Sequence, residues 1–236
     1  MSGRGTIVAI DGPAGAGKST VSRALARRFG YVYVDTGAMY RVVALLARER
    51  GITPQDGPAL GGLAATVDIH FEPVDDGTQR VLTGGRDVTT AIRTQEIGDL
   101  ASRISTHSEV RERLVALQRR AGLAAQPGAV LEGRDIGTVV FPDADVKIFL
   151  DASVGERATR RMRELRGRGL EPEPDAVHRE ITERDHRDRG RPHSPLREAP
   201  DAERVDTTGL AADEVVTRLA ECCESALRRR KTGPIG

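Results

Sequence analysis

The sequence contains no asparagine and no tryptophan, and only 3% of its residues are aromatic. Proteins that switch on guanine nucleotides read the base with an Asn-Lys-x-Asp stretch, which a chain without asparagine cannot contain. Few aromatic side chains also leave few platforms on which the bases of a nucleic-acid strand could stack. These two absences argue against a GTP-driven switch and against a protein that tracks along nucleic acid.

The charge is nearly balanced. Lysine and arginine total 36 and aspartate and glutamate total 35, so the formal net charge is +1. No general basic field is available to recruit nucleic acid or a membrane surface. Almost all of the positive charge is arginine, and the only lysines are Lys18, Lys147 and Lys231. Arginine clusters must therefore be judged by their position and not by their number.

Cysteine and long apolar runs are also scarce. The only cysteines, Cys222 and Cys223, are adjacent, and Cα atoms about 3.8 Å apart are closer than a normal disulfide spans. No apolar run approaches about 18 residues, and no basic segment followed by an apolar one opens the chain. We expect a protein of a reducing compartment, the cytoplasm, with no membrane partner. A chain of 236 residues can bury a core without disulfides or metal.

The most informative stretch is residues 12–20, because Gly12, Gly17, Lys18 and Ser19 fill the four fixed positions of a phosphate-binding P-loop. An apolar strand precedes it and a helical pattern follows it, so the glycines lie at a strand-to-helix turn. The loop amides and the helix start would bind the phosphates of a nucleoside triphosphate, with Lys18 on the β- and γ-phosphates and Ser19 on Mg²⁺. The alternative is a chance glycine turn, which the low lysine content makes rare. The predicted nucleotide-binding residues are Gly12, Pro13, Ala14, Gly15, Ala16, Gly17, Lys18, Ser19 and Thr20.

Hydrophobic patterning predicts a three-layer α/β fold around a parallel sheet. Five strands, at 6–10, 31–34, 129–131, 146–150 and 203–206, alternate with helices at 18–29, 37–50, 94–106, 109–121, 153–167, 176–189 and 213–230. Met39, Val42, Val43 and Leu46 form the expected buried stripe of the second helix. Residues 122–128 are expected to be a linker.

A small antiparallel sheet is expected as an insertion into this pattern. Residues 51–62 are predicted to be a loop. Val67, Ile69 and Phe71 then alternate with polar residues as a half-buried strand does, Asp76-Gly77 forms a turn, and short strands follow at 80–83 and 87–89.

Polar residues follow the carboxyl ends of two predicted strands, where open α/β sheets place their ligand crevice. Thr36, Tyr40 and Arg41 begin one helix, and the alternative there is helix capping by Thr36 with a solvated Arg41. Arg134 and Asp135 lie between glycines after a buried strand, and the alternative is a structural salt bridge at a turn. The strand position favours a functional role for this pair.

Two arginine-rich helices form a predicted lid. In the first, Arg157, Arg160, Arg161 and Glu164 recur at helical spacing, and Glu164 is the only acid expected near them. Besides a simple solvated face, they suit mobile arginines that close over a triphosphate. In the second, Arg184, Asp188 and Arg191 share one stripe, which suits either an exposed ion-pair ladder or a clamp for a phosphorylated sugar. Asp185 and Arg189 are expected to point elsewhere.

Taken together, these stretches resemble the bacterial cytidylate kinases. The resemblance rests on residues 10–20 (IDGPAGAGKST), 35–41 (DTGAMYR), 92–96 (IRTQE), 133–151 (GRDIGTVVFPDADVKIFLD), 183–191 and 205–209. It covers nearly the whole chain, and the GRDIGTVVFPDA run is more specific than the P-loop. It implies a single P-loop kinase domain over 1–236, with a core at about 1–60 and 108–236, a nucleotide-monophosphate-binding insertion at about 61–107 and a lid at about 153–191.

The resemblance also implies an activity, the transfer of phosphate from ATP to CMP or dCMP by a monomer that binds no nucleic acid. By motif, the base would be contacted by Thr36, Arg111, Asp135 and Arg191, the pentose by Ser102, Arg184 and Asp188, and the acceptor phosphate by Arg41 and Arg134. Relatives can carry serine at position 36, and the hydroxyl is kept here. The predicted catalytic residues are Lys18, Arg134, Arg157, Arg161 and Arg184, and the predicted metal ligand is Ser19.

Two rival activities remain open at this point. A P-loop kinase for AMP, UMP or another small acceptor would satisfy the same local chemistry. A nucleic-acid-stimulated ATPase could use residues 146–151 as a carboxylate-ended strand, although the low net charge and few aromatics oppose it.

Overall fold

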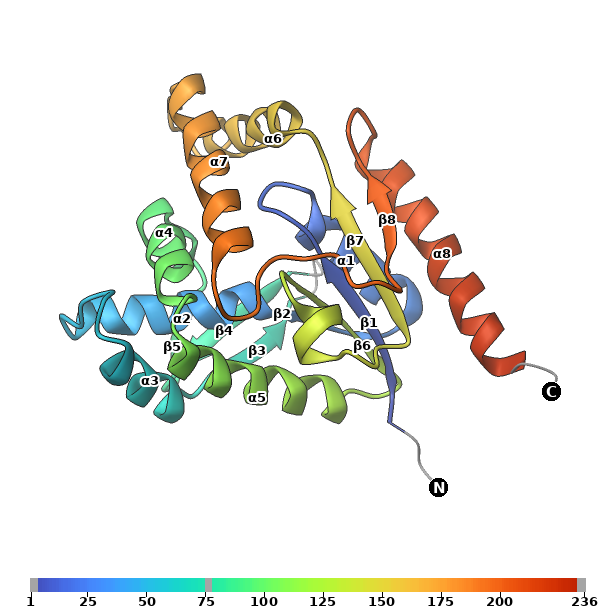
Figure 1. The fold of residues 1–236 in the computed structure, drawn as a ribbon, viewed down its shortest axis with the longest axis horizontal. Helices are drawn as coiled ribbons and strands as arrows, with labels where there is room; N and C mark the ends of the chain where they lie inside the picture. The colour runs from blue at the N-terminus through green and yellow to red at the C-terminus, as the bar shows by residue number, and fades with distance from the viewer. Residues whose placement is uncertain (1–3, 75–77, 233–236) are drawn as a thin grey trace. The chain divides into compact units, whose positions relative to one another are not determined.

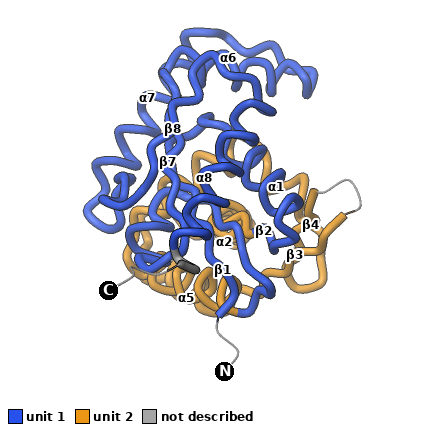
Figure 2. The backbone as a smooth tube through the Cα atoms, turned by 90° about the vertical axis from the view of Figure 1, so that its right-hand side faces the viewer, with its two compact units in different colours: residues 1–33, 124–236 blue, residues 34–123 orange. Residues whose placement is uncertain are grey.

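The computed structural model describes residues 4–74 and 78–232, so the turn predicted at Asp76-Gly77 lies outside the described residues. The chain divides into two compact units. One contains residues 1–33 and 124–236, and the other contains residues 34–123, as the two colours of Figure 2 show. The predicted boundaries of core, insertion and lid remain predictions.

A five-stranded parallel sheet forms the first unit's centre, with the order β2-β6-β1-β7-β8. Its strands are β1 (Thr6–Asp11), β2 (Val32–Asp35), β6 (Gly128–Gly133), β7 (Val146–Asp151) and β8 (Glu203–Asp206). Only Val32 and Tyr33 of β2 belong to this unit. The register places Asp11 beside Gly133 of β6 and beside Phe149 of β7. The predicted five-stranded α/β fold is confirmed.

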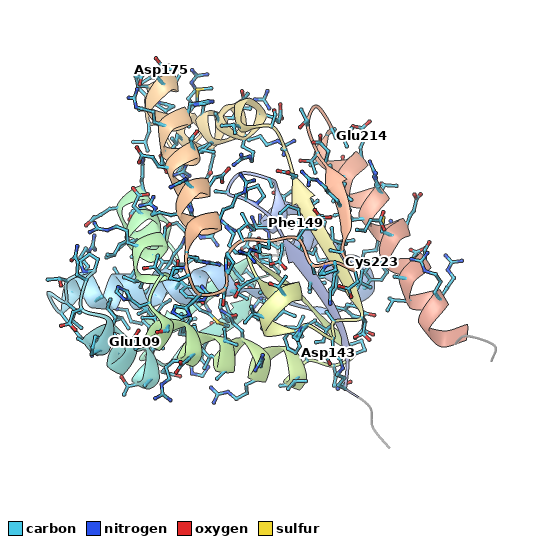
Figure 3. The ribbon with its side chains drawn as sticks, viewed as in Figure 1. Glu109, Asp143, Phe149, Asp175, Glu214 and Cys223 are labelled. Carbon is cyan, nitrogen blue, oxygen red and sulfur yellow. The ribbon has the colours of Figure 1, made fainter. Side chains whose placement is uncertain are left out.

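The central strands are apolar on both faces because helices cover both sides of a parallel sheet. Ile7, Val8, Ala9 and Ile10 of β1 are fully buried. Side chains from α1 (Lys18–Phe29) and α8 (Ala212–Thr232) complete this core, among them Leu25 and Leu219. Figure 1 shows α8 running alongside β8, and Figure 3 labels Cys223 on α8 and Phe149 on β7.

The helices α6 (Val154–Arg166) and α7 (Pro174–Gly190) pack on each other through a small separate core of Ala158, Leu165, Val177 and Ile181. Ser153 caps α6 by accepting a hydrogen bond from the Glu156 amide at 3.2 Å. α7 begins at Pro174, two residues before the predicted start, because proline is well suited to a first helical turn. Figure 1 shows the two helices together, after β7 in the chain.

The second unit contains the predicted antiparallel sheet, with the order β3-β4-β5. Its strands are β3 (His70–Pro73), β4 (Gln79–Thr83) and β5 (Arg86–Asp87). The helical elements are α2 (Thr36–Glu49), α3 (Gly57–Thr66), the 3₁₀ turn η1 (Ala91–Arg93), α4 (Gln95–Ile104) and α5 (Ser108–Ala124), whose last residue belongs to the first unit.

Several local predictions in this unit were wrong. The predicted loop at 51–62 contains the start of α3, which Asp56 caps by accepting a hydrogen bond from the Ala59 amide at 3.0 Å. The predicted strand that includes Val67, Ile69 and Phe71 is shorter in the structure. It consists of β3 (His70–Pro73) alone, because α3 continues to Thr66. In α2, Leu45 is buried in place of Leu46, which is half-buried. α5 continues through the first part of the predicted linker at 122–128.

Across residues 4–74 and 78–232, we find no helix that combines the length and the apolar character needed to cross a membrane.

Candidate functional site

The P-loop lies between the carboxyl end of β1 and the start of α1. Gly12 has φ 151°, and a Cβ there would lie 2.0 Å from the carbonyl oxygen of Leu150, so only glycine fits. Gly17 caps α1 in the left-handed conformation with φ 91°, and no side chain occupies the cap. The first amides of α1 are therefore left for an external anion, which suits the phosphates of a nucleotide.

Lys18 is the first residue of α1, directly after the loop, and it is buried. Its Nζ donates a hydrogen bond to the carbonyl oxygen of Pro13 at 2.7 Å. Burial lowers the pKa of Lys18 well below its ordinary value, and the positive charges of Arg134 and Arg184 lower it further. An anion bound in the loop would offset both effects, because it stabilises the charged amine. This position suits an ammonium group that faces a phosphate.

Beside Lys18, a hydroxyl and a carboxylate lie together. Ser19 Oγ donates a hydrogen bond to Glu132 Oε2 at 2.9 Å, and the Tyr33 hydroxyl donates to the other oxygen of the same buried carboxylate. These are the oxygen ligands that Mg²⁺ prefers, usually one or two from the protein with the rest from phosphates and water. Within the described residues there is no group of three or more acidic, histidine or cysteine side chains that would form a complete metal site. The donor set therefore fits a Mg²⁺ ion that arrives with a nucleotide.

Sequence reasoning missed Glu132. The signal was available, because Glu132 is a charged residue near the end of a buried strand, immediately before Gly133. Its importance became visible only when the parallel pairing of β6 with β1 brought it beside the P-loop helix.

The Arg134-Asp135 pair forms the turn at the end of β6. Arg134 Nε donates to Asp188 Oδ2 at 2.8 Å, and Asp135 Oδ1 lies 3.8 Å from Arg191 Nη2. Both ion pairs connect the turn to the α7 segment, so the turn does contain salt bridges, and the functional role of the pair remains a prediction. A single π-helical turn, η2 (Ile136–Val140), follows directly. Sequence patterns did not predict it, and such turns occur often at functional sites.

The predicted stripe of Arg184, Asp188 and Arg191 faces inward. Asp188 and Arg191 are buried and Arg184 is half-buried, so the alternative of an exposed ion-pair ladder is wrong. Burial alone would raise the pKa of Asp188, but the charges of Arg134, Arg184 and Arg191 outweigh it and hold that pKa below its usual value. The carboxylate therefore stays ionised among guanidinium groups, an arrangement that can hold an anionic, hydroxyl-bearing ligand.

The arginines of α6 have different ion-pair partners and different degrees of burial. Arg160 pairs with Glu156 at 3.0 Å and donates to Thr207, while Arg161 donates to Glu164 at 2.9 Å. Arg157 is 2% exposed and pairs with Asp185 of α7 at 2.6 Å. The expectation that Glu164 is the only nearby acid was wrong, since Glu156 and Asp185 are also partners.

Arg157 also connects the P-loop to the helices that follow β7. Its guanidinium donates to the carbonyl oxygens of Ala152 at 2.9 Å and Ala14 at 3.2 Å. Three partners hold this side chain, whereas the sequence suggested a mobile lid arginine. A contact between Arg157 and a triphosphate remains a prediction.

Replacing Arg157 with methionine should lower the free energy of unfolding by about 3–5 kcal/mol, because the buried Asp185 carboxylate loses its counter-charge. Urea denaturation followed by circular dichroism measures this. The double variant Arg157→Met/Asp185→Leu should recover much of the loss. Arg28→Met removes the exposed pair with Glu224, 3.1 Å apart, and should cost less than about 1 kcal/mol. Equal losses of unfolding free energy in Arg157→Met and Arg28→Met would contradict the conclusion that Arg157 and Asp185 form a buried, stabilising ion pair.

The other predicted substrate residues lie in the second unit. Thr36 begins α2, but Asp35 caps this helix by accepting a hydrogen bond from the Ala38 amide at 2.9 Å, so capping by Thr36 is wrong. Thr36, Ser102 of α4 and Arg111 of α5 are buried. Arg41 is half-buried and not fully solvated. Arg111 stacks over the ring of Tyr40 at 5.5 Å and donates to the Ser105 carbonyl at 3.3 Å.

Comparison with known proteins identifies the family. The cytidylate kinase family model matches residues 8–225. The cytidylate kinase of Geobacter sulfurreducens is 51% identical over 233 residues, which cover 99% of this chain and 97% of that protein. The cytidylate kinase of Exiguobacterium sibiricum is 51% identical over 221 residues, which cover 94% of this chain and 98% of that protein.

A solved structure of an uncharacterized protein from Eubacterium ventriosum has a similar fold, with a TM-score of 0.52 at 11% identity over 93% of this chain and 99% of that chain. This likeness concerns the fold alone. The family match spans the P-loop, the Arg134-Asp135 turn and the stripe of α7, and by this match the chain belongs to the cytidylate kinase family.

Proposed function

We propose that this protein transfers the γ-phosphoryl group of ATP to CMP or dCMP and releases ADP with CDP or dCDP. The observation that carries the proposal is the combination, within one unit, of a P-loop lysine with a cluster of three arginines and two carboxylates, of which Asp135, Asp188 and Arg191 are buried and Arg134 and Arg184 half-buried. The P-loop suits a triphosphate donor, and the cluster suits an acceptor that bears both a phosphate and hydrogen-bonding groups. Membership in the cytidylate kinase family supports this assignment.

On the donor side, the amides of residues 12–20 would bind the ATP phosphates, and Lys18 would contact the transferred group. Ser19 would hold Mg²⁺ with the help of Glu132, either directly or through water, and the ion would neutralise phosphate charge. Arg161 of α6 would reach the triphosphate when the lid helices approach it.

On the acceptor side, each residue has a proposed contact. Asp135, Arg191, Thr36 and Arg111 would contact the base. Asp188, Arg184 and Ser102 would contact the pentose, and Arg134 and Arg41 the acceptor phosphate. Cytosine carries an N4 amine, from which the Asp135 carboxylate can accept a hydrogen bond, whereas uracil presents a carbonyl oxygen that the carboxylate repels. Selectivity would therefore come from repulsion as well as from attraction.

Catalysis in this scheme is positioning plus charge stabilisation. The acceptor phosphate is already a nucleophile when it is deprotonated, so the protein needs no general base. Lys18, Arg134 and Arg184 would stabilise charge on the group in transfer. Arg134 and Arg184 both lower the pKa of Lys18, so their charges lie near its amine.

A panel of acceptors tests the proposal directly. The purified chain is incubated with ATP and Mg²⁺ and with CMP, dCMP, UMP, AMP or no acceptor, and ADP release is followed with a coupled assay. We expect turnover with CMP or dCMP at least about tenfold above that with UMP or AMP. A preference for another acceptor would favour the rival kinase. ADP release that needs no acceptor and increases when nucleic acid is added would favour the ATPase.

A further inference from the structure

Asp11 is a buried carboxylate to which the proposed mechanism gives no role. It is the last residue of β1, directly before Gly12 of the P-loop, and it is 5% exposed. Both of its oxygens accept hydrogen bonds from main-chain amides far away in the sequence. Oδ1 accepts from the Ile136 amide at 2.8 Å, and Oδ2 accepts from the Gly137 amide at 2.7 Å.

These two amides belong to the turn that carries the acceptor-binding pair. Ile136 and Gly137 begin η2 immediately after Asp135. Asp135 occupies the cap position of η2, yet its side chain makes no capping hydrogen bond to this turn. The Asp135 carbonyl oxygen accepts instead from the Val139 and Val140 amides, at 2.9 and 3.1 Å. Asp11 thus caps η2 from another strand, and the Asp135 carboxylate is directed toward Arg191.

Burial of Asp11 disfavours the charged form of its carboxylate. Burial raises the pKa of Asp11 to about 6, although the two amides and Lys18 lower it, and the nearby Asp135 raises it further. An apolar side chain would avoid the burial of a charge, but it would leave the Ile136 and Gly137 amides without this acceptor. Buried carboxylates whose pKa is raised in this way are frequent at functional sites.

We propose that Asp11 is a positioning residue that connects the donor loop to the acceptor turn. By holding the Ile136 and Gly137 amides, its carboxylate fixes the orientation of Arg134 and Asp135 relative to the first residue of the P-loop. This inference rests on the proposed function, because it assigns CMP to that turn. It leads us to expect that a defect at Asp11 alters acceptor recognition more than ATP binding.

Asp11→Asn is the sharpest test, since it keeps the size and shape of the side chain. An asparagine can accept from only one of the two amides, and its own NH₂ group would face the other. We expect the KM for CMP to rise about tenfold and the preference for CMP over UMP to fall, while the KM for ATP changes less than about twofold. Hydrogen exchange at the Ile136 and Gly137 amides should accelerate in the variant.

Asp145→Asn is a matched control at the opposite end of the same strand. Asp145 Oδ2 accepts from the Ile7 amide near the start of β1 at 2.7 Å, so this change likewise weakens a hydrogen bond between a carboxylate and a main-chain amide. It should leave the KM for CMP within about twofold of wild type, because it lies away from the acceptor turn.

The outcomes separate the inference from the proposed function. A wild-type chain that makes no CDP would refute the function, whereas an active wild type with an unchanged KM for CMP in folded Asp11→Asn would refute only the inference. Equal rises in both KM values would point to general disruption and would also overturn it. Should the variant fail to fold, fast exchange of the Ile136 and Gly137 amides in the wild type would still count against the inference.

Discussion

Lys18→Ala should lower kcat by at least about 10²–10³-fold, the loss typical of removing one preorganised donor from a reacting group. The structure strengthens this expectation, because the Lys18 side chain is buried and its Nζ is held by the Pro13 carbonyl oxygen at 2.7 Å. No bulk solvent would replace its charge beside the transferred phosphate. Single-turnover kinetics with CMP, ATP and Mg²⁺ measure the chemical step.

Lys147→Ala is the matched control for this prediction. Lys147 Nζ also donates to the carbonyl oxygen of a proline five residues earlier, Pro142, at 2.6 Å, as Lys18 does with Pro13. Lys147 additionally pairs with Asp201 at 2.8 Å, and it has no proposed contact with phosphate. Its removal should leave kcat within about threefold of wild type. Near-normal turnover in Lys18→Ala, or an equal loss in Lys147→Ala, would contradict the role of the P-loop lysine.

The sequence was sufficient to predict the sheet and the donor loop. Buried parallel strands are mostly apolar, so residues 6–10 and 146–150, which are apolar except for Thr6 and Lys147, were recognisable without tertiary information. The P-loop is similarly local, because its glycines serve the backbone conformation of one short turn. The stripe on α7 also followed from helical spacing, and the structure confirmed that Asp188 and Arg191 lie on one buried face.

Other features depend on contacts between distant segments. Three glycines lower the helical propensity of 57–66, yet burial of Leu60 and Leu63 stabilises α3 there. Arg157 looked like one of several similar arginines until the packing of α6 on α7 brought Asp185 to it. Glu132 and Asp11 act across strand pairs whose order no local pattern specifies.

Asp135→Ala should abolish the preference for CMP over UMP, lowering the ratio of their kcat/KM values by at least about tenfold. The carboxylate is buried beside Arg191, so little water is present to weaken either its attraction for an amine or its repulsion of a carbonyl oxygen. Asp143→Ala is the control, since Asp143 lies eight residues further on, is 70% exposed and pairs with Arg4 (Figure 3). An unchanged ratio in Asp135→Ala would refute the role of this residue.

Asp135→Asn tests the same hypothesis through a gain of activity with UMP. The asparagine side chain has nearly the same shape, but it can turn its NH₂ group toward the base and donate to the O4 carbonyl of uracil. Activity with UMP should therefore rise above that of Asp135→Ala while activity with CMP stays low. Kinetics with both acceptors at saturating ATP distinguish this from a general packing defect, which would lower both activities together. A repulsive carboxylate and a donating amide at one position should thus select different pyrimidines, because the two bases differ there only in donor and acceptor.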